Sequence, residues 1–237
     1  MHKKIKVACG NCSLQQLCLP VGLENNEFVK LEKIVQRGKP LSRGKHVYYP
    51  GDQFTSLYAV RSGAIKTYKV ANDGTEYVTS FYLPGEIIGL DALSSGIHSC
   101  GAKTLETTSL CEIPYNQLDT IAITIPNISR QLLKIMSHEI KCDEQMLTMI
   151  GSQPAKSRLI ALFLSLSARL KRRGYSETEF SLSMSRADIG SYLGLAVETV
   201  SRLLKKLQDQ NLIEVNHRQI KLLDIDQLRE MVNLDIQ

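Results

Sequence analysis

Three cysteines stand close together near the start of the chain, with a spacing that suits a shared binding loop. Cys9, Cys12 and Cys18 are separated by two and then five residues, and Cys111 follows much later in the chain. Soft metals and iron–sulfur clusters are held by several thiolates that converge on one point. No second Cys-x-x-Cys pair follows, as it would in a zinc ribbon. The spacing therefore favours a surface-held cluster, with structural zinc as the alternative.

The composition limits the classes of protein that can hold such a site. The chain has 237 residues, 43% hydrophobic content and a formal charge of +5, enough for one large domain or two modest ones. Its longest apolar run, residues 159–168, is too short to span a bilayer. No apolar segment typical of a secretory signal follows the first lysines. We therefore expect a cytoplasmic protein with free or metal-bound thiols.

Residues 23–125 predict the scaffold of a sensor domain. Turn signals interrupt short aromatic and β-branched runs at Pro50-Gly51, Ser62-Gly63, Asn72-Asp73-Gly74 and Pro84-Gly85. This rhythm is typical of an antiparallel β-roll or jelly roll. A further strand over 109–113 would carry Cys111, while residues 1–22 form the cysteine-rich segment.

Residues 126–152 predict a long helix with two apolar stripes. One has the alternating three- and four-residue steps of a coiled-coil seam. The other would pack on the β-roll. The helix is therefore predicted to form a homodimer, the alternative being one broad buried face in a monomer. The seam comprises Leu133, Met136, Ile140, Asp143, Leu147 and Ile150, and the second stripe Ile128, Leu132, Ile135, Cys142, Met146 and Met149.

Asp143 is the one acidic residue in this seam. Facing its symmetry mate, it would bring two carboxylates together and oppose association. A dimer held near its dissociation point suits a switch, because a few kcal/mol then change its occupancy. The alternative is an ordinary solvent-facing residue beside Glu139 and Glu144.

Residues 153–237 predict a winged helix-turn-helix, making the whole chain an α+β protein. A helix from Ala155 would stop before Gly174. Ser185 and Asp188 have capping-box spacing at the start of a second helix. Gly194 would make the tight turn into a third helix, residues 196–208. Runs at 212–215 and 220–222 then predict a small hairpin, or wing.

The third helix presents residues that could read base edges. Its inward stripe comprises Val197, Val200, Leu204 and Leu207. Glu198, Ser201 and Arg202 share an outward face near the N-terminal end. Arg202 can donate two bonds to guanine, and Glu198 can accept from cytosine. The alternative is a surface Glu–Arg pair. Ala196 is a weak residue for the helix cap.

Together these features are similar to one family. Cys9, Cys12, Cys18 and Cys111, combined with Val197-Glu198-Thr199-Val200-Ser201-Arg202, resemble the fumarate and nitrate reduction (FNR) regulators of the CRP/FNR superfamily, over nearly the whole chain. The resemblance implies a transcription factor in which these four cysteines hold an oxygen-sensing [4Fe–4S] cluster. Oxygen would degrade the cluster to a [2Fe–2S] form and then to apoprotein, and the dimer would dissociate.

The resemblance also implies the partners. A cluster-bound homodimer would bind double-stranded DNA at a palindrome resembling TTGAT-N4-ATCAA, read by Glu198, Ser201 and Arg202. Half-sites would lie about 34 Å apart, one helical turn. Bound there, the protein would mainly activate anaerobic genes through RNA polymerase, contacted by β-roll loops such as residues 72–74 and by the region around Arg173.

Other functions follow less well from the residues. A cyclic-nucleotide-responsive regulator would need an arginine for the phosphate, and residues 98–105 offer only Lys103. A zinc-stabilised regulator stays open. An enzyme is not expected, because no nucleophile–base set, phosphate loop or cofactor fingerprint is present. Of the two remaining cysteines, Cys142 is expected to be a small buried residue, and Cys100 is a possible substitute ligand.

Overall fold

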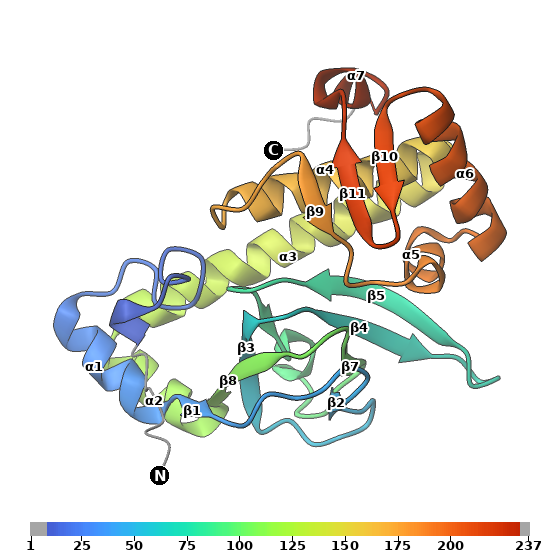
Figure 1. The fold of residues 1–237 in the computed structure, drawn as a ribbon. Helices are drawn as coiled ribbons and strands as arrows, with labels where there is room; N and C mark the ends of the chain where they lie inside the picture. The colour runs from blue at the N-terminus through green and yellow to red at the C-terminus, as the bar shows by residue number, and fades with distance from the viewer. Residues whose placement is uncertain (1–8, 233–237) are drawn as a thin grey trace, which may run out of the picture. The chain divides into compact units, whose positions relative to one another are not determined.

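The computed structural model describes residues 9–232, except for the side chains of Asn11 and Asn25. It contains two compact units (Figure 1). Unit 1 comprises Met1–Gly74 and Ser80–Ile140, and unit 2 comprises Thr75–Thr79 and Lys141–Gln237. The predicted α+β class is confirmed: one unit is built on a β-roll and the other on a helix-turn-helix with a wing.

The β-roll has two four-stranded sheets, whose recorded strand pairings are antiparallel. In strand order, the first contains β1 (Gln36–Arg37), β8 (Ser109–Pro114), β3 (Ser56–Ser62) and β6 (Ile87–Ile88); the second contains β2 (His46–Tyr48), β7 (Gly101–Thr104), β4 (Ile65–Val70) and β5 (Glu76–Tyr82). The predicted turns are present. Gly63 shows why one of them needs glycine: its φ is +83°, and a Cβ there would lie 2.6 Å from the carbonyl oxygen of Thr107.

Two helices of unit 1 were not predicted, and both help to form its main core. They are α1 (Asn25–Ile34) and α2 (Tyr115–Thr124). In α1, Phe28, Leu31 and Ile34 recur at helical spacing and are buried. They pack with Leu19 of the N-terminal loop and with residues of β3, β6, β8 and α2. This core anchors the cysteine-rich segment to the β-roll, because Cys9, Cys18 and Cys111 pack against its edge.

The long helix α3 (Pro126–Ser152) matches the predicted bounds. Its seam is mostly exposed: Leu133, Ile140 and Leu147 have 66%, 58% and 72% of their surface accessible, Asp143 is exposed, and Met136 and Ile150 are half-buried. On the second stripe Ile128 and Met149 are buried. Cys142 is the exception, because it is exposed rather than buried as predicted. Its position lies where the helix passes from one unit to the other, between Ile140 and Lys141.

Unit 2 has the predicted helices and wing, and it adds one strand and one short C-terminal helix that were not predicted. Its helices are α4 (Ala155–Lys171), α5 (Arg186–Leu193), α6 (Val197–Asp209) and α7 (Ile225–Glu230). The wing strands β10 (Ile213–Asn216) and β11 (Gln219–Leu222) pair with a third strand, β9 (Glu179–Ser181). Helix α4 ends two residues before the predicted Arg173, and Gly174 follows in a left-handed conformation. Among the described residues, no helix is both long and apolar enough to cross a bilayer.

Candidate metal centre and DNA-reading helix

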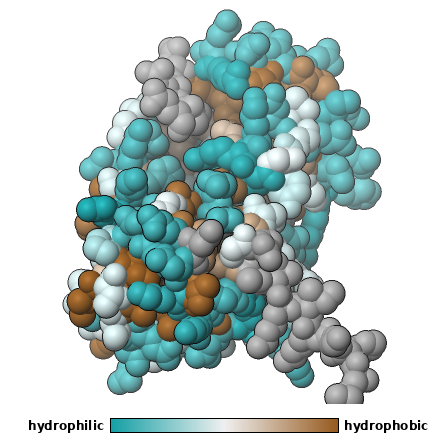
Figure 2. All heavy atoms as spheres, turned by 90° about the vertical axis from the view of Figure 1, so that its left-hand side faces the viewer, coloured by the Kyte–Doolittle hydropathy of each residue, from teal (hydrophilic) through white to brown (hydrophobic). Residues whose placement is uncertain are grey.

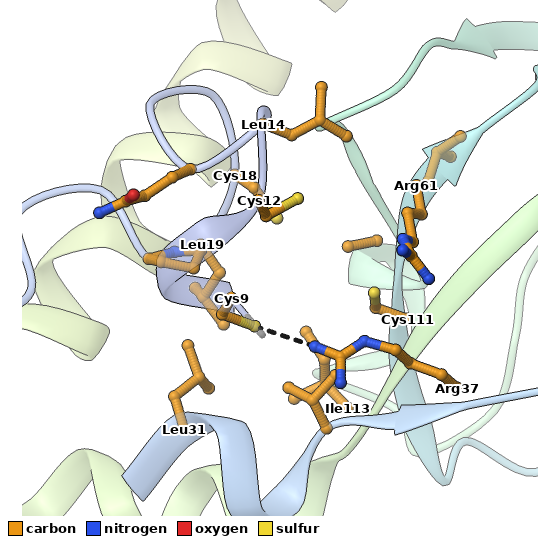
Figure 3. Close-up of a pocket in the computed structure, with 15 residues that line it drawn as sticks. Cys9, Cys12, Leu14, Cys18, Leu19, Leu31, Arg37, Arg61, Cys111 and Ile113 are labelled. Atoms are coloured by element: carbon orange, nitrogen blue, oxygen red, sulfur yellow. Dashed lines mark hydrogen bonds between the residues drawn. The ribbon is translucent and has the colours of Figure 1, made fainter. Parts of the chain in front are cut away.

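All four predicted cysteine ligands line a single pocket. Cys9, Cys12 and Cys18 approach it from the N-terminal loop, and Cys111 faces them from β8 (Figure 3). Apolar side chains complete much of the wall, among them Leu14, Leu19, Leu31, Ala59 and Ile113. The cavity has a volume of about 40 Å³, which is room for roughly three water molecules. The structure therefore brings together residues that the sequence separates by more than ninety positions.

Tight turns direct the three N-terminal cysteines inward. The short helix η1 (Cys9–Asn11) ends with the N–H of Cys12 donating to the carbonyl of Cys9 at 3.2 Å. The N–H of Gln15 then donates to the carbonyl of Cys12 at 3.0 Å, and that of Val21 to the carbonyl of Cys18 at 3.1 Å. Each cysteine thus opens a turn. Buried Leu19 fixes the end of the loop in the core.

Cys111 is held by the sheet. In the register of β8 it stands opposite Ala59 of β3 and Arg37 of β1. Side chains two apart on a strand share a face, so Cys111 lies on the same face as Ile113. The fourth thiol therefore sits on a rigid strand, while the other three belong to a loop that docks against it.

Burial governs the ionisation of these thiols. It raises the pKa of Cys9 and of Cys18 to about 12 each. Burial also raises the pKa of Cys111, against the opposing charges of Arg37 and Arg61. Because their pKa values are raised, the thiols of Cys9, Cys18 and Cys111 favour the protonated form in the metal-free protein and are poor nucleophiles. Metal binding would displace these protons, since a coordinated thiol is deprotonated.

Two arginines complete the pocket, and the sequence reasoning missed both. Arg37 forms a salt bridge with Glu32, and Arg61 lies beside Cys111 in the lining (Figure 3). The Arg37 guanidinium holds the pKa of Glu32 down at about 2. The Nε atom of Arg37 is buried and has no hydrogen-bond partner among the described residues. The site thus combines thiols with cationic donors, which suits an anionic metal–sulfur group.

The residues that line the pocket are chemically suited to an anionic metal–sulfur group. Among the described residues that line the pocket, only the cysteines are of the types that commonly ligate metals, and four thiolates are the usual ligands of a [4Fe–4S] cluster. The same set also suits zinc. Within residues 9–232, no three His, Cys, Asp or Glu side chains stand close enough to hold a single metal ion. The buried, unpaired Nε of Arg37 would gain an acceptor from a bound anionic group.

Neither of the two remaining cysteines is in this pocket. Cys100 is buried in a different core, packed with Tyr48, Val60 and Ile65. Cys142 is exposed on α3. The possibility that Cys100 substitutes for a ligand is therefore not supported by its position.

Figure 2 faces the side of the molecule on which Figure 1 draws α1 and the N-terminal loop. Figure 2 shows hydrophobic side chains in separate patches among hydrophilic ones on this face. Val29 of α1, which is 56% exposed, is one hydrophobic residue outside the core. The cysteine pocket therefore owes its apolar lining to the buried core beneath it rather than to a broad apolar surface.

The predicted DNA-reading residues lie together on α6. Glu198 and Arg202 are exposed, and Ser201 is half-buried. Val200, Leu204 and Leu207 are buried as predicted, whereas Val197 is 41% exposed, because it stands in the first turn of the helix. The prediction that Val197 belongs to the inward stripe is therefore wrong. Ala196 is the N-cap and makes no side-chain capping bond.

The turn before α6 follows the predicted chemistry and adds two residues. The Ser185 hydroxyl accepts from the N–H of Asp188, and Gly194 is left-handed with a φ of 65°. Gly190 lets the chain fold back closely, since a Cβ there would lie 2.6 Å from the carbonyl oxygen of Leu195. Arg186 donates to the Ser201 hydroxyl at 3.2 Å. The Gly-x-x-x-Gly spacing of Gly190 and Gly194 was a sequence signal for this close turn. No sequence signal indicated the contact of Arg186 with Ser201.

Two family models match the two units. Residues 39–124 match the cyclic nucleotide-binding domain, and residues 157–231 match the Crp-like helix-turn-helix domain. Among solved structures, FixK2 from Bradyrhizobium japonicum is similar with a TM-score of 0.75 and 29% identity, covering 85% of this chain and 98% of that one.

Curated relatives extend this similarity to more than nine-tenths of the chain. The chain is 45% identical to the transcriptional activator protein Anr of Pseudomonas protegens over 93% of this chain and 90% of the relative. It is 41% identical to the fumarate and nitrate reduction regulatory protein of Escherichia coli over 95% and 90%, respectively. These relatives are regulators rather than enzymes. The chain belongs to the FNR/Anr family of DNA-binding transcription regulators within the CRP/FNR superfamily.

Proposed function

We propose that this regulator senses oxygen through a [4Fe–4S] cluster held by Cys9, Cys12, Cys18 and Cys111. The observation that carries the proposal is the convergence of these four thiols on one pocket. When bound, the cluster would supply an oxygen-sensitive inorganic centre. The names of the relatives, fumarate and nitrate reduction regulatory proteins, support a role in anaerobic metabolism. A cytoplasmic location suits a protein that binds DNA and keeps its thiols reduced.

The chain's own residues would couple this centre to dimerisation. Three cysteines lie on a loop that packs on the core of unit 1, and that core also holds Ile128 at the beginning of α3. Docking the loop would stabilise this end of α3. The exposed seam residues Ile140 and Leu147, with the half-buried Met136 and Ile150, would then pair with a second copy, and Asp143 would weaken the contact. The dimer would present two α6 helices to a palindromic site.

Zinc is the rival metal, because its ligands can be the same four thiols. A cyclic nucleotide is a weaker alternative despite the name of the matching domain. The space between the two sheets is filled by a core that includes Tyr48, Ile65, Ile88 and Ala102. The carboxylate of Glu86, which follows Gly85 in the Gly-Glu pair typical of a cyclic-nucleotide site, instead accepts the backbone N–H of Leu83 at 2.8 Å within its own turn. RNA polymerase is the proposed protein partner of the DNA-bound form.

Purification without oxygen tests the proposal directly. We expect about four iron and four sulfide per chain, with a visible absorption band that bleaches in air. Iron, acid-labile sulfide and the spectrum are measured before and after air is admitted. One zinc per chain, or no metal and no colour change, would contradict the oxygen-sensor function and leave DNA binding in place.

The DNA-reading role of α6 is tested by exchanging the reading residues. Arg202→Ala should weaken binding to the palindrome by roughly 1–3 kcal/mol per half-site and relax the choice of base at one position. Lys205→Ala, at another exposed position of α6, is the matched control. If Lys205 contacts only phosphate, its removal should weaken binding to all sequences by the same factor. The affinities for the palindrome and for variants at each position are measured at fixed salt. Unchanged base preference in Arg202→Ala would exclude a base contact.

A further inference from the structure

Arg37 connects the two sides of the cysteine pocket. It stands opposite Cys111 in the register of β1 and β8. Its Nη2 atom lies 3.5 Å from the Sγ of Cys9, the contact drawn in Figure 3. Its charge also acts on the Cys111 thiol. One guanidinium therefore lies beside a thiol of the loop and a thiol of the sheet.

Glu32, in the last turn of α1, holds this guanidinium in place. Nη1 of Arg37 donates to Oε1 of Glu32 at 2.6 Å, and Nη2 donates to Oε2 at 2.9 Å. The same Oε2 accepts the backbone N–H of Cys9 at 2.7 Å. The Glu32 carboxylate therefore binds the backbone N–H of Cys9, while the Arg37 guanidinium contacts the sulfur of Cys9.

We propose that Glu32 and Arg37 are positioning residues that dock Cys9 against the sheet beside Cys111 and supply hydrogen bonds to the sulfur of a bound cluster. The inference rests on the proposed function and deepens it. The two-point bond between guanidinium and carboxylate fixes the plane of Arg37. That plane leaves Nε, which is buried and unpaired among the described residues, free to donate to an anionic group in the pocket.

The pair is shielded enough for this role. The side chains of Arg37 and Glu32 are 17% and 28% exposed, so solvent weakens their bond less than at an open surface. Lysine cannot replace Arg37 fully, because it carries the charge without the planar fork. Hydrogen bonds to the sulfurs and net charge both set the reduction potential of an iron–sulfur cluster. Loss of Arg37 removes a hydrogen-bond donor and a positive charge from beside the cluster, so it should lower the reduction potential.

The first experiment uses the metal-free protein, so it is independent of the cluster. Amide hydrogen exchange of the peptide containing Cys9 is compared in the parent, Glu32→Ala, Arg37→Gln and Arg37→Lys. Loss of a charge-assisted bond should speed exchange there by roughly tenfold, with the peptide containing Cys100 unchanged. Arg43→Gln, an exposed arginine outside the pocket, is the control and should match the parent.

The second experiment measures the reduction potential of the reconstituted cluster and its rate of bleaching in air. Arg37→Gln should lower the potential and bleach faster, with Arg37→Lys between it and the parent. Equal exchange at Cys9 in all variants, or equal potentials, would overturn the inference. If Arg37→Gln does not fold, Arg37→Lys and Glu32→Ala decide. If the parent holds no iron, the proposed function fails, and the exchange experiment still decides the docking of Cys9.

Discussion

Cys111→Ala is expected to abolish cluster binding, lowering iron from about four per chain to a small residual amount. Cys111 is the one candidate ligand that a β-sheet holds in place, between β1 and β3. Without it, the three cysteines of the loop have no thiol opposite them. Anaerobic DNA binding should fall with the iron content, because the dimer would not form. Iron, sulfide and anaerobic gel-shift affinity are measured on the same preparations.

Two other cysteines provide matched controls for this prediction. Cys100→Ser alters a buried thiol in a different core, and Cys142→Ser alters an exposed one on α3. Both variants should keep the iron content and the air-sensitive spectrum of the parent. Full iron in Cys111→Ala would refute the assignment of the pocket. Loss of iron in Cys100→Ser without unfolding would instead assign Cys100 as a ligand.

Asp143→Ala is expected to convert the air-exposed protein from monomer to dimer. On the predicted two-fold axis, two Asp143 carboxylates would repel each other by about 1–4 kcal/mol at close range, depending on how well solvent screens them. Their removal should tighten dimerisation by roughly fivefold or more, since about 1.4 kcal/mol corresponds to a tenfold change in affinity. The exposed seam residues Leu133, Ile140 and Leu147 supply the attraction. Sedimentation and DNA affinity in air provide the measurement.

The pH dependence gives a second check on Asp143. Desolvation raises the pKa of this carboxyl above its ordinary value. Protonation removes the repulsion, so dimerisation of the metal-free protein should tighten as the pH falls toward that raised pKa. Asp143→Asn should dimerise independently of pH over the same interval. Glu144→Ala, an exposed neighbour outside the seam, is the control. A parent-like monomer in Asp143→Ala would show that another feature limits association.

The sequence alone predicted the features that depend on local rules. The spacing of Cys9, Cys12 and Cys18 places three thiols on one loop. The Ser185–Asp188 capping box and left-handed Gly194 define the turn before α6, because capping and positive φ are decided within a few residues. The β-roll followed from turn signals and the bounds of α3 from its apolar period. The sequence offered Cys111 as a fourth candidate, and the resemblance to a family assigned it as a ligand.

Only the tertiary structure decided how distant residues meet. Cys100 and Cys111 are both partly or fully buried cysteines, yet strand register directs Cys111 to the loop and packing directs Cys100 into another core. The contact of Arg37 with Glu32 and Cys9 depends on that same register and on the docking of α1. The contacts of Cys9 with Glu32 and Arg37, and of Cys111 with the loop, join separate segments of the chain. The local preferences of each segment carry no information about which partner it will meet.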